Sequence, residues 1–80
     1  MTELLFKFEK DIHVRGFSNS TIKSYMYKLK YYLQFCKEHS QPVNSDSFKD
    51  YIFSLKKYNK LSLASIKQNV GAVKFFLNTL

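Results

Sequence analysis

Eighty residues, 45% of them hydrophobic and 18% aromatic, predict one domain whose core depends on Phe and Tyr. With two Gly and one Pro, the composition favours helices over a turn-rich β fold. We expect a cytoplasmic protein without membrane spans, because no apolar run reaches roughly 18 residues, the N-terminus lacks a signal-peptide pattern, and a single Cys cannot form an internal disulfide.

The net charge of +7 is unevenly distributed along the chain. Residues 12–37 contain five basic residues and no acid, and residues 51–80 contain another five and no acid. A surface adapted only for solubility would mix both signs. Acid-free basic stretches instead indicate a polyanionic partner.

The first predicted helix runs from Glu3 to Arg15. Leu5, Phe8 and Ile12 recur at helical spacing and form its apolar face. Gly16 follows directly, where a residue in the left-handed conformation commonly ends a helix. The sequence therefore predicts a helix closed by a glycine cap.

The second predicted helix begins after Ser18, whose hydroxyl is a suitable N-cap, and ends at about residues 37–39. Phe17 and Ile22 have the spacing of a hydrophobic staple across this start. The apolar face is long: it comprises Ile22, Tyr25, Met26, Leu29, Leu33 and Cys36. Lys23, Lys30 and Lys37 follow one flank of that face.

Two shorter helices are predicted to follow. A connection at residues 40–43 leads to Asn44, an N-cap candidate, and a second connection at residues 58–61 leads to Ser62, another one. The third helix is predicted to bury Phe48, Tyr51, Ile52 and Leu55. The fourth is predicted to bury Ile66, Val70, Val73 and Leu77, with Leu63 and Phe76 at the margins and Phe75 nearly opposite.

The second and fourth helices repeat one pattern. A shift of 44 positions superimposes their starts, apolar positions and lysines. The matching pairs are Ser18 with Ser62, Ile22 with Ile66, Lys23 with Lys67, Met26 with Val70, Leu29 with Val73, Lys30 with Lys74, and Leu33 with Leu77. We interpret the pair as a basic clamp: its lysines would bind phosphate, and the helix starts would offer backbone N–H groups to anions.

Catalytic chemistry is not indicated. His13 and His39 have no cysteine or acidic cluster at metal-ligand spacing, and both are expected at the surface. Cys36 falls on an apolar face, as expected for a core residue. Arg15 is the only arginine, and the chain has no glycine-rich phosphate loop. We therefore expect no catalytic residue, no metal, no cofactor and no enzyme activity.

Some positions allow two interpretations. Phe75, Tyr31 and Phe35 project away from the predicted core faces, so they either pack against neighbouring helices or form an exposed docking face. Gly71 permits close approach either of a sugar–phosphate backbone or of another helix. A helical protein–protein module with a basic surface is therefore an alternative function, and an amphipathic membrane-surface protein is a third, which the absence of Trp disfavours.

Four segments in order resemble the N-terminal core-binding, SAM-like domain of the tyrosine recombinase and phage integrase family. They are Gly16-Phe17-Ser18, then Ser18-x-x-Thr21-Ile22-x-x-Tyr25, then Val43-Asn44, then Ser62-x-x-Ser65-Ile66 continuing through Val70-Gly71-Ala72-Val73-Lys74-Phe75-Phe76. Gly71 stands where the family often has Ser, and Lys74 where it often has Arg. These differences remove a possible hydroxyl contact and weaken a bidentate base contact.

The resemblance implies an all-α, four-helix SAM-like domain over residues 1–80, forming half of a C-shaped clamp on the core recombination site. Its second and fourth helices would lie against the major groove. The catalytic residues of the family belong to a C-terminal domain that is absent from this chain. The implied partners are double-stranded DNA, that catalytic domain and other recombinase protomers, with no membrane.

The expected DNA contacts come from the two matched helices. Lysines would bind phosphate without reading bases, whereas the Gln68 amide is suited to pairing with adenine. The candidates on the second helix are Asn19, Ser20, Thr21, Lys23, Tyr27 and Lys30. On the fourth helix they are Ser62, Ala64, Lys67, Gln68, Gly71 and Lys74, and Lys60 would add a further cation.

Overall fold

The computed structural model describes residues 2–58 and 61–80, so the predicted 58–61 connection and Lys60 lie partly or wholly outside the described residues. The described residues form four helices and no strand, which confirms the predicted all-α fold. The helices are α1 (Thr2–Val14), α2 (Asn19–Glu38), α3 (Ser45–Lys57) and α4 (Leu63–Asn78).

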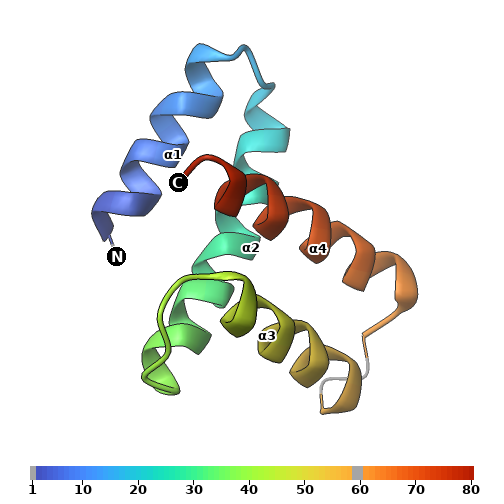
Figure 1. Cartoon of the computed structure of the whole chain (residues 1–80). Coiled ribbons are helices and arrows are strands. Elements are labelled where there is room, and N and C mark those ends of the chain that lie inside the picture. Colours follow the sequence, from blue (N-terminus) through green and yellow to red (C-terminus); the bar gives the residue numbers. More distant parts are fainter. Residues whose placement is uncertain (1, 59–60) are drawn as a thin grey trace.

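Helix α2 is the centre of the arrangement. It packs against α1, α3 and α4, and α3 also packs against α4. Figure 1 shows α1 beside the first half of α2, while α3 and α4 extend to the other side and lie next to each other. The domain measures 35 × 27 × 17 Å along its principal axes. The longest amphipathic segment of the sequence therefore serves as the helix on which the others assemble.

The predicted helix ends are confirmed by their hydrogen bonds. Gly16 has a φ of 86°, a backbone conformation in which a residue with a side chain would be strained. Its N–H donates to the His13 carbonyl (3.0 Å), and the Phe17 N–H donates to the Ile12 carbonyl (3.1 Å). These two bonds form a Schellman motif that ends α1 and turns the chain toward α2.

The three N-caps also form as predicted. Ser18 Oγ accepts the Thr21 N–H (3.3 Å), and Ser62 Oγ accepts the Ser65 N–H (3.2 Å). Asn44 Oδ1 accepts the N–H groups of the first turn of α3, and Ser47 Oγ accepts the Asn44 N–H in return. This reciprocal pair is a capping box built with serine in place of the usual acid or amide.

The core confirms many of the predicted positions and corrects others. Tyr25, Met26, Phe48 and Ile52 pack against the core but are only half-buried. Tyr32, which the apolar pattern did not select, is fully buried, Phe76 is central rather than marginal, and Leu63 is exposed. On α4, Ala72 and Phe76 are buried, whereas Val70 and Leu77 are only half-buried. The buried cluster comprises Phe8, Ile12, Ile22, Leu29, Tyr32, Leu33, Cys36, Tyr51, Leu55, Val73 and Phe76.

Phe75 packs against α1 rather than facing solvent. Its ring lies 5.8 Å from that of Phe8, 5.8 Å from Phe17 and 6.0 Å from Tyr25. Arg15 stands over the same ring, 5.6 Å from its centre. The aromatic cluster fixes the turn after α1 on the C-terminal half of α4, so Phe75 is a structural residue.

One polar network joins α2 to the start of α3. The Tyr32 hydroxyl donates to the Asn44 carbonyl (3.1 Å) and lies 2.8 Å from Ser47 Oγ. The Cys36 thiol also donates to Ser47 Oγ, at 3.6 Å. Because each polar atom has a partner, the network is buried without an unpaired group, and Cys36 is a core residue as expected.

Candidate nucleic-acid interface

The candidate DNA-contact residues lie at the surface of their helices. On α2, Thr21 is half-buried and the other five candidates are exposed. All six candidates on α4 are exposed. The core faces of α2 and α4 point toward each other and toward their neighbours, which leaves the predicted contact residues accessible.

The lysines at the matched positions are exposed and carry no counter-ion. Lys23, Lys30, Lys67 and Lys74 make no ion pair within residues 2–58 and 61–80, where the pair described is Arg15 with Asp11 at 2.9 Å. Their charge is therefore not neutralised inside the domain. Such lysines can bind phosphate without first breaking an internal salt bridge.

The hydroxyl groups at the helix starts are partly used by the caps. Ser18 Oγ donates to Thr21 Oγ1 (2.8 Å) and lies 3.4 Å from Ser20 Oγ. Ser62 Oγ donates to Ser65 Oγ in the same way (3.1 Å). Capping therefore accounts for the hydroxyl groups of Thr21 and Ser65.

Gly71 is exposed, and a Cβ built on it would have no neighbour within 4 Å. The interpretation that Gly71 permits close helix packing is therefore wrong. The remaining interpretation, close approach of an outside backbone, stays a prediction.

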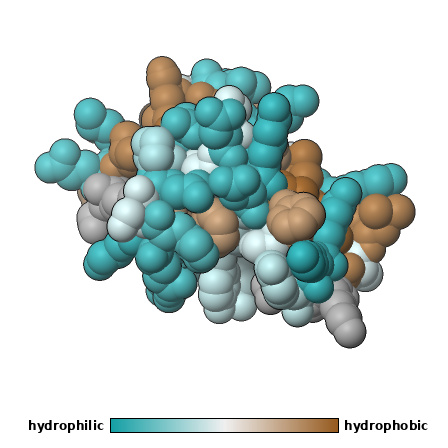
Figure 2. All heavy atoms as spheres, turned by 60° about the horizontal axis from the view of Figure 1, so that its bottom comes forward, coloured by the Kyte–Doolittle hydropathy of each residue, from teal (hydrophilic) through white to brown (hydrophobic). Residues whose placement is uncertain are grey.

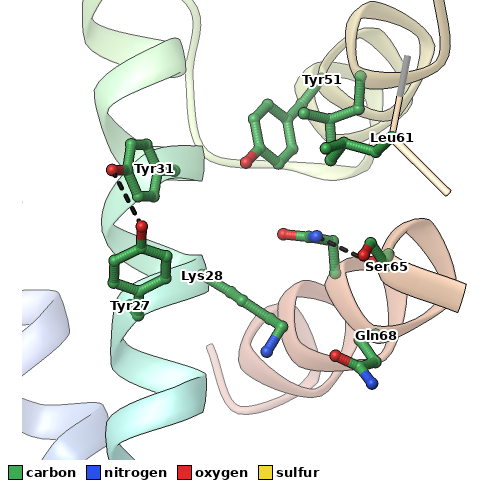
Figure 3. Close-up of a pocket in the computed structure, with 9 residues that line it drawn as sticks. Tyr27, Lys28, Tyr31, Tyr51, Leu61, Ser65 and Gln68 are labelled. Carbon is green, nitrogen blue, oxygen red and sulfur yellow. Dashed lines mark hydrogen bonds between the residues drawn. The ribbon is translucent and has the colours of Figure 1, made fainter. Parts of the chain in front are cut away.

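A cleft between α2, α3 and α4 brings two candidates together (Figure 3). Tyr27 borders it from α2 and Gln68 from α4, and its volume is about 390 Å³. The other candidates do not line it. The residues around the cleft are Tyr27, Lys28, Tyr31, Tyr51, Leu55, Leu61, Ser65, Gln68 and Asn69.

Tyr27 and Tyr31 form a pair on the α2 side of this cleft. Their ring centres are 5.0 Å apart in an edge-to-face arrangement, and their hydroxyls are 3.3 Å apart. The hydrogen bond with Tyr31 raises the pKa of Tyr27. The spacing of four residues could have revealed this pair, but the cleft itself depends on α3 and α4 and was not predicted.

Phe35, another candidate for an exposed docking face, is half-buried, whereas Tyr31 is exposed. The Phe35 ring packs at a tilt against His39, 4.2 Å between ring centres, and against Tyr51 at 5.3 Å. Phe35 is half-buried, and Phe75 belongs to the aromatic cluster with α1. The docking face assembled from Phe75, Tyr31 and Phe35 is therefore not formed.

Surface hydropathy agrees with a polar outer face. Figure 2, seen from the α3 side, shows mostly hydrophilic atoms interrupted by separate hydrophobic groups. Both histidines are exposed, and the described residues contain no group of three or more metal-ligating side chains. None of the described helices has the length and apolarity needed to cross a membrane.

Comparison with known proteins assigns the domain. A family model described as the phage integrase N-terminal SAM-like domain matches residues 4–80. No curated protein and no solved structure shows significant similarity to the chain. The match spans all four helices, and the fold that it implies is the one observed. The chain therefore belongs to the family of phage integrase N-terminal SAM-like domains.

Proposed function

We propose that this domain binds double-stranded DNA at the core site of a recombination element, as the non-catalytic part of a tyrosine recombinase. The observation that carries the proposal is the exposure of unpaired lysines at matched positions of α2 and α4. Integrase family membership supports DNA as the polyanion. The twelve candidate residues from Asn19 to Lys74 supply the contacts, with Gln68 as the base reader.

The proposed partners follow from the same family membership. A catalytic domain of the same full-length protein would act on the DNA strands, and other recombinase protomers would occupy neighbouring sites. Neither role requires a cofactor or a membrane. We place this activity in the cytoplasm, where the domain would meet the DNA of a recombination element.

The test is the salt dependence of duplex binding. Each phosphate neutralised by a lysine contributes about 0.9 to the slope of log affinity against log salt. Four such contacts, from Lys23, Lys30, Lys67 and Lys74, predict a slope of about −3.6. The double variant Lys23→Ala/Lys67→Ala should reduce the magnitude of this slope by about 1.8. Fluorescence anisotropy of a labelled duplex over a salt series measures both values.

The matched control is Lys7→Ala/Lys49→Ala. Both lysines are exposed, on α1 and α3, and the double variant loses the same two charges. We expect it to change the slope far less. If the two double variants have equal slopes, bulk charge alone attracts the DNA and the proposed contact surface is refuted.

A further inference from the structure

We propose that the cleft between α2, α3 and α4 binds a nucleobase that has left the duplex stack, so that the domain has a single-strand site beside its duplex-binding surface. The inference rests on the proposed function only in taking the ligand to be a nucleic acid. Most residues that line the cleft are not among the proposed duplex contacts. Tyr27 and Gln68 are the two shared residues.

Aromatic surface is exposed beside the cleft. Tyr27 is 64% exposed and Tyr31 is 49% exposed, although both rings border a concave site. Aromatic side chains that stay accessible beside a cleft are the usual platforms for unstacked bases, because every base presents a π-face. The edge-to-face pairing of these rings gives the platform a fixed geometry without burying it.

Amide side chains of α4 stand on the wall of the cleft opposite the tyrosines. Gln68 is exposed, with both donor and acceptor groups. The Asn69 Nδ2 donates to the Ser65 carbonyl (2.9 Å), which orients the Asn69 side chain. Figure 3 shows Ser65 and Gln68 of α4 across the open space from Tyr27 and Tyr31. A base placed between them would stack on one side and meet hydrogen-bonding groups on the other.

The cleft also carries a positive charge at its border. Among the described residues that border the cleft, Lys28 is the one cation and none is acidic. Its Nζ donates to Ser24 Oγ, one turn earlier on α2. Lys28 is thus held at the edge of the site, where it can pair with the phosphate attached to a bound base. A purely apolar peptide segment would offer no partner to the Gln68 amide or to the remaining N–H donors of Lys28.

The size of the site also fits. A volume of about 390 Å³ is near the lower end of the ~300–1,000 Å³ range of small-molecule sites. The apolar wall is completed by Leu55 and Leu61, and Tyr51 closes it from α3. The cleft therefore suits one planar heterocycle better than an extended chain.

The experiment is binding of a short single-stranded oligothymidine, followed by fluorescence anisotropy, with Tyr31→Ala as the principal variant. Tyr31 is not a proposed duplex contact, so this change isolates the cleft. Loss of one stacking platform should weaken single-strand binding about tenfold. Tyr31→Phe keeps the ring and should bind within about twofold of the unchanged protein, since stacking does not need the hydroxyl.

The matched control is Tyr58→Ala. Tyr58 is 68% exposed, as accessible as Tyr27, and does not border the cleft. It should leave single-strand affinity within about twofold, because surface aromatics away from a site contribute little. Equal losses in Tyr31→Ala and Tyr58→Ala, or no measurable single-strand binding at all, would overturn the inference. Circular dichroism melting verifies that each variant is folded.

A second measurement reports the base directly. An oligonucleotide carrying a single 2-aminopurine should lose fluorescence when the base stacks on the tyrosines, and Tyr31→Ala should restore it. Unquenched fluorescence in the bound complex would show that backbone contacts alone hold the strand, and the site would be rejected.

Failure of this inference is distinguishable from failure of the proposed function. The salt slope of duplex binding tests the lysines, and Tyr31→Ala should leave that slope unchanged because it removes no charge. A domain that binds duplex but shows no Tyr31-dependent single-strand binding retains the proposed function and loses the cleft site. The reverse outcome would retain the cleft site and remove the duplex-binding role.

Discussion

Helices α2 and α4 share a sequence pattern and differ in their surroundings. The shift of 44 positions pairs Leu29 with Val73, both fully buried, and Ile22 with Ile66, also both buried. It also pairs Tyr32 with Phe76, which are the two largest fully buried side chains. The equivalence therefore includes Tyr32, which the apolar stripes omitted, but it fails at the pair Leu33 and Leu77, because Leu33 is buried and Leu77 is only half-buried.

The neighbouring pair shows the opposite behaviour. Tyr31 and Phe75 are also 44 residues apart, yet Tyr31 is exposed at the cleft and Phe75 is packed between α1 and the turn that follows it. Helix α1 covers this position on α4, and no helix covers it on α2. Similar sequence therefore gives similar buried faces, while the outer faces are decided by which helix lies alongside.

The largest expected effect on stability comes from Phe76, the α4 residue that is equivalent to Tyr32. Phe76→Ala should lower the free energy of unfolding by about 3–5 kcal/mol, because a fully buried ring is lost and a cavity is left against Phe8. Phe75→Ala, next in sequence and half-buried, should cost less, and Tyr31→Ala should stay within about 1 kcal/mol. Urea denaturation followed by circular dichroism gives the order. A larger loss for Tyr31→Ala than for Phe76→Ala would break the equivalence.

A smaller loss of stability is expected from Tyr32→Phe. This change tests what the hydroxyl contributes at Tyr32, the α2 residue equivalent to Phe76. The change removes the bonds to Asn44 and Ser47, but both groups retain other partners, so we expect a loss of about 1–2 kcal/mol. Tyr27→Phe is the control, since its hydroxyl is at the surface and should contribute little. Equal losses would show that the buried network has no special weight.

The same variant has a distinct alkaline signature. Burial raises the pKa of Tyr32 from 10.0 to about 12 and that of Tyr51 to about 12. The folded state therefore retains these phenol protons more tightly than the unfolded chain. Their contribution to stability is complete below pH 10 and is lost as pH rises toward about 12. Tyr32→Phe, which lacks one of the two groups, should show a shallower decline across that interval.

The smallest effect has the opposite sign. Gly71→Ala should stabilise the domain by about 0.5–1 kcal/mol, because alanine favours the helix and its Cβ would meet nothing. If a DNA backbone approaches α4 closely at this position, the same change should weaken duplex affinity. Thermal melting and anisotropy on one variant separate the two effects. Higher stability with unchanged affinity would mean that Gly71 is not a contact.

Local order was predictable from the sequence. The Gly16 cap, the three N-caps and the helix boundaries follow from residue chemistry within a few positions, and each was found with its expected hydrogen bonds. The surface position of the lysines was predictable for the same reason, because a charged side chain on the flank of an apolar stripe must remain solvated. Whether those lysines contact DNA stays a prediction.

Tertiary structure decided what one helix pattern cannot encode. Helix α4 carries apolar residues on more than one side, so its own spacing could not select Phe76 over Leu77 as the core position. Packing against neighbouring helices, including the contact of Phe76 with Phe8 of α1, made that choice. The burial of Phe75 required α1, and the cleft beside Tyr31 required three helices at once. Periodicity defines the faces of a helix, but only neighbouring elements determine which of them loses contact with water.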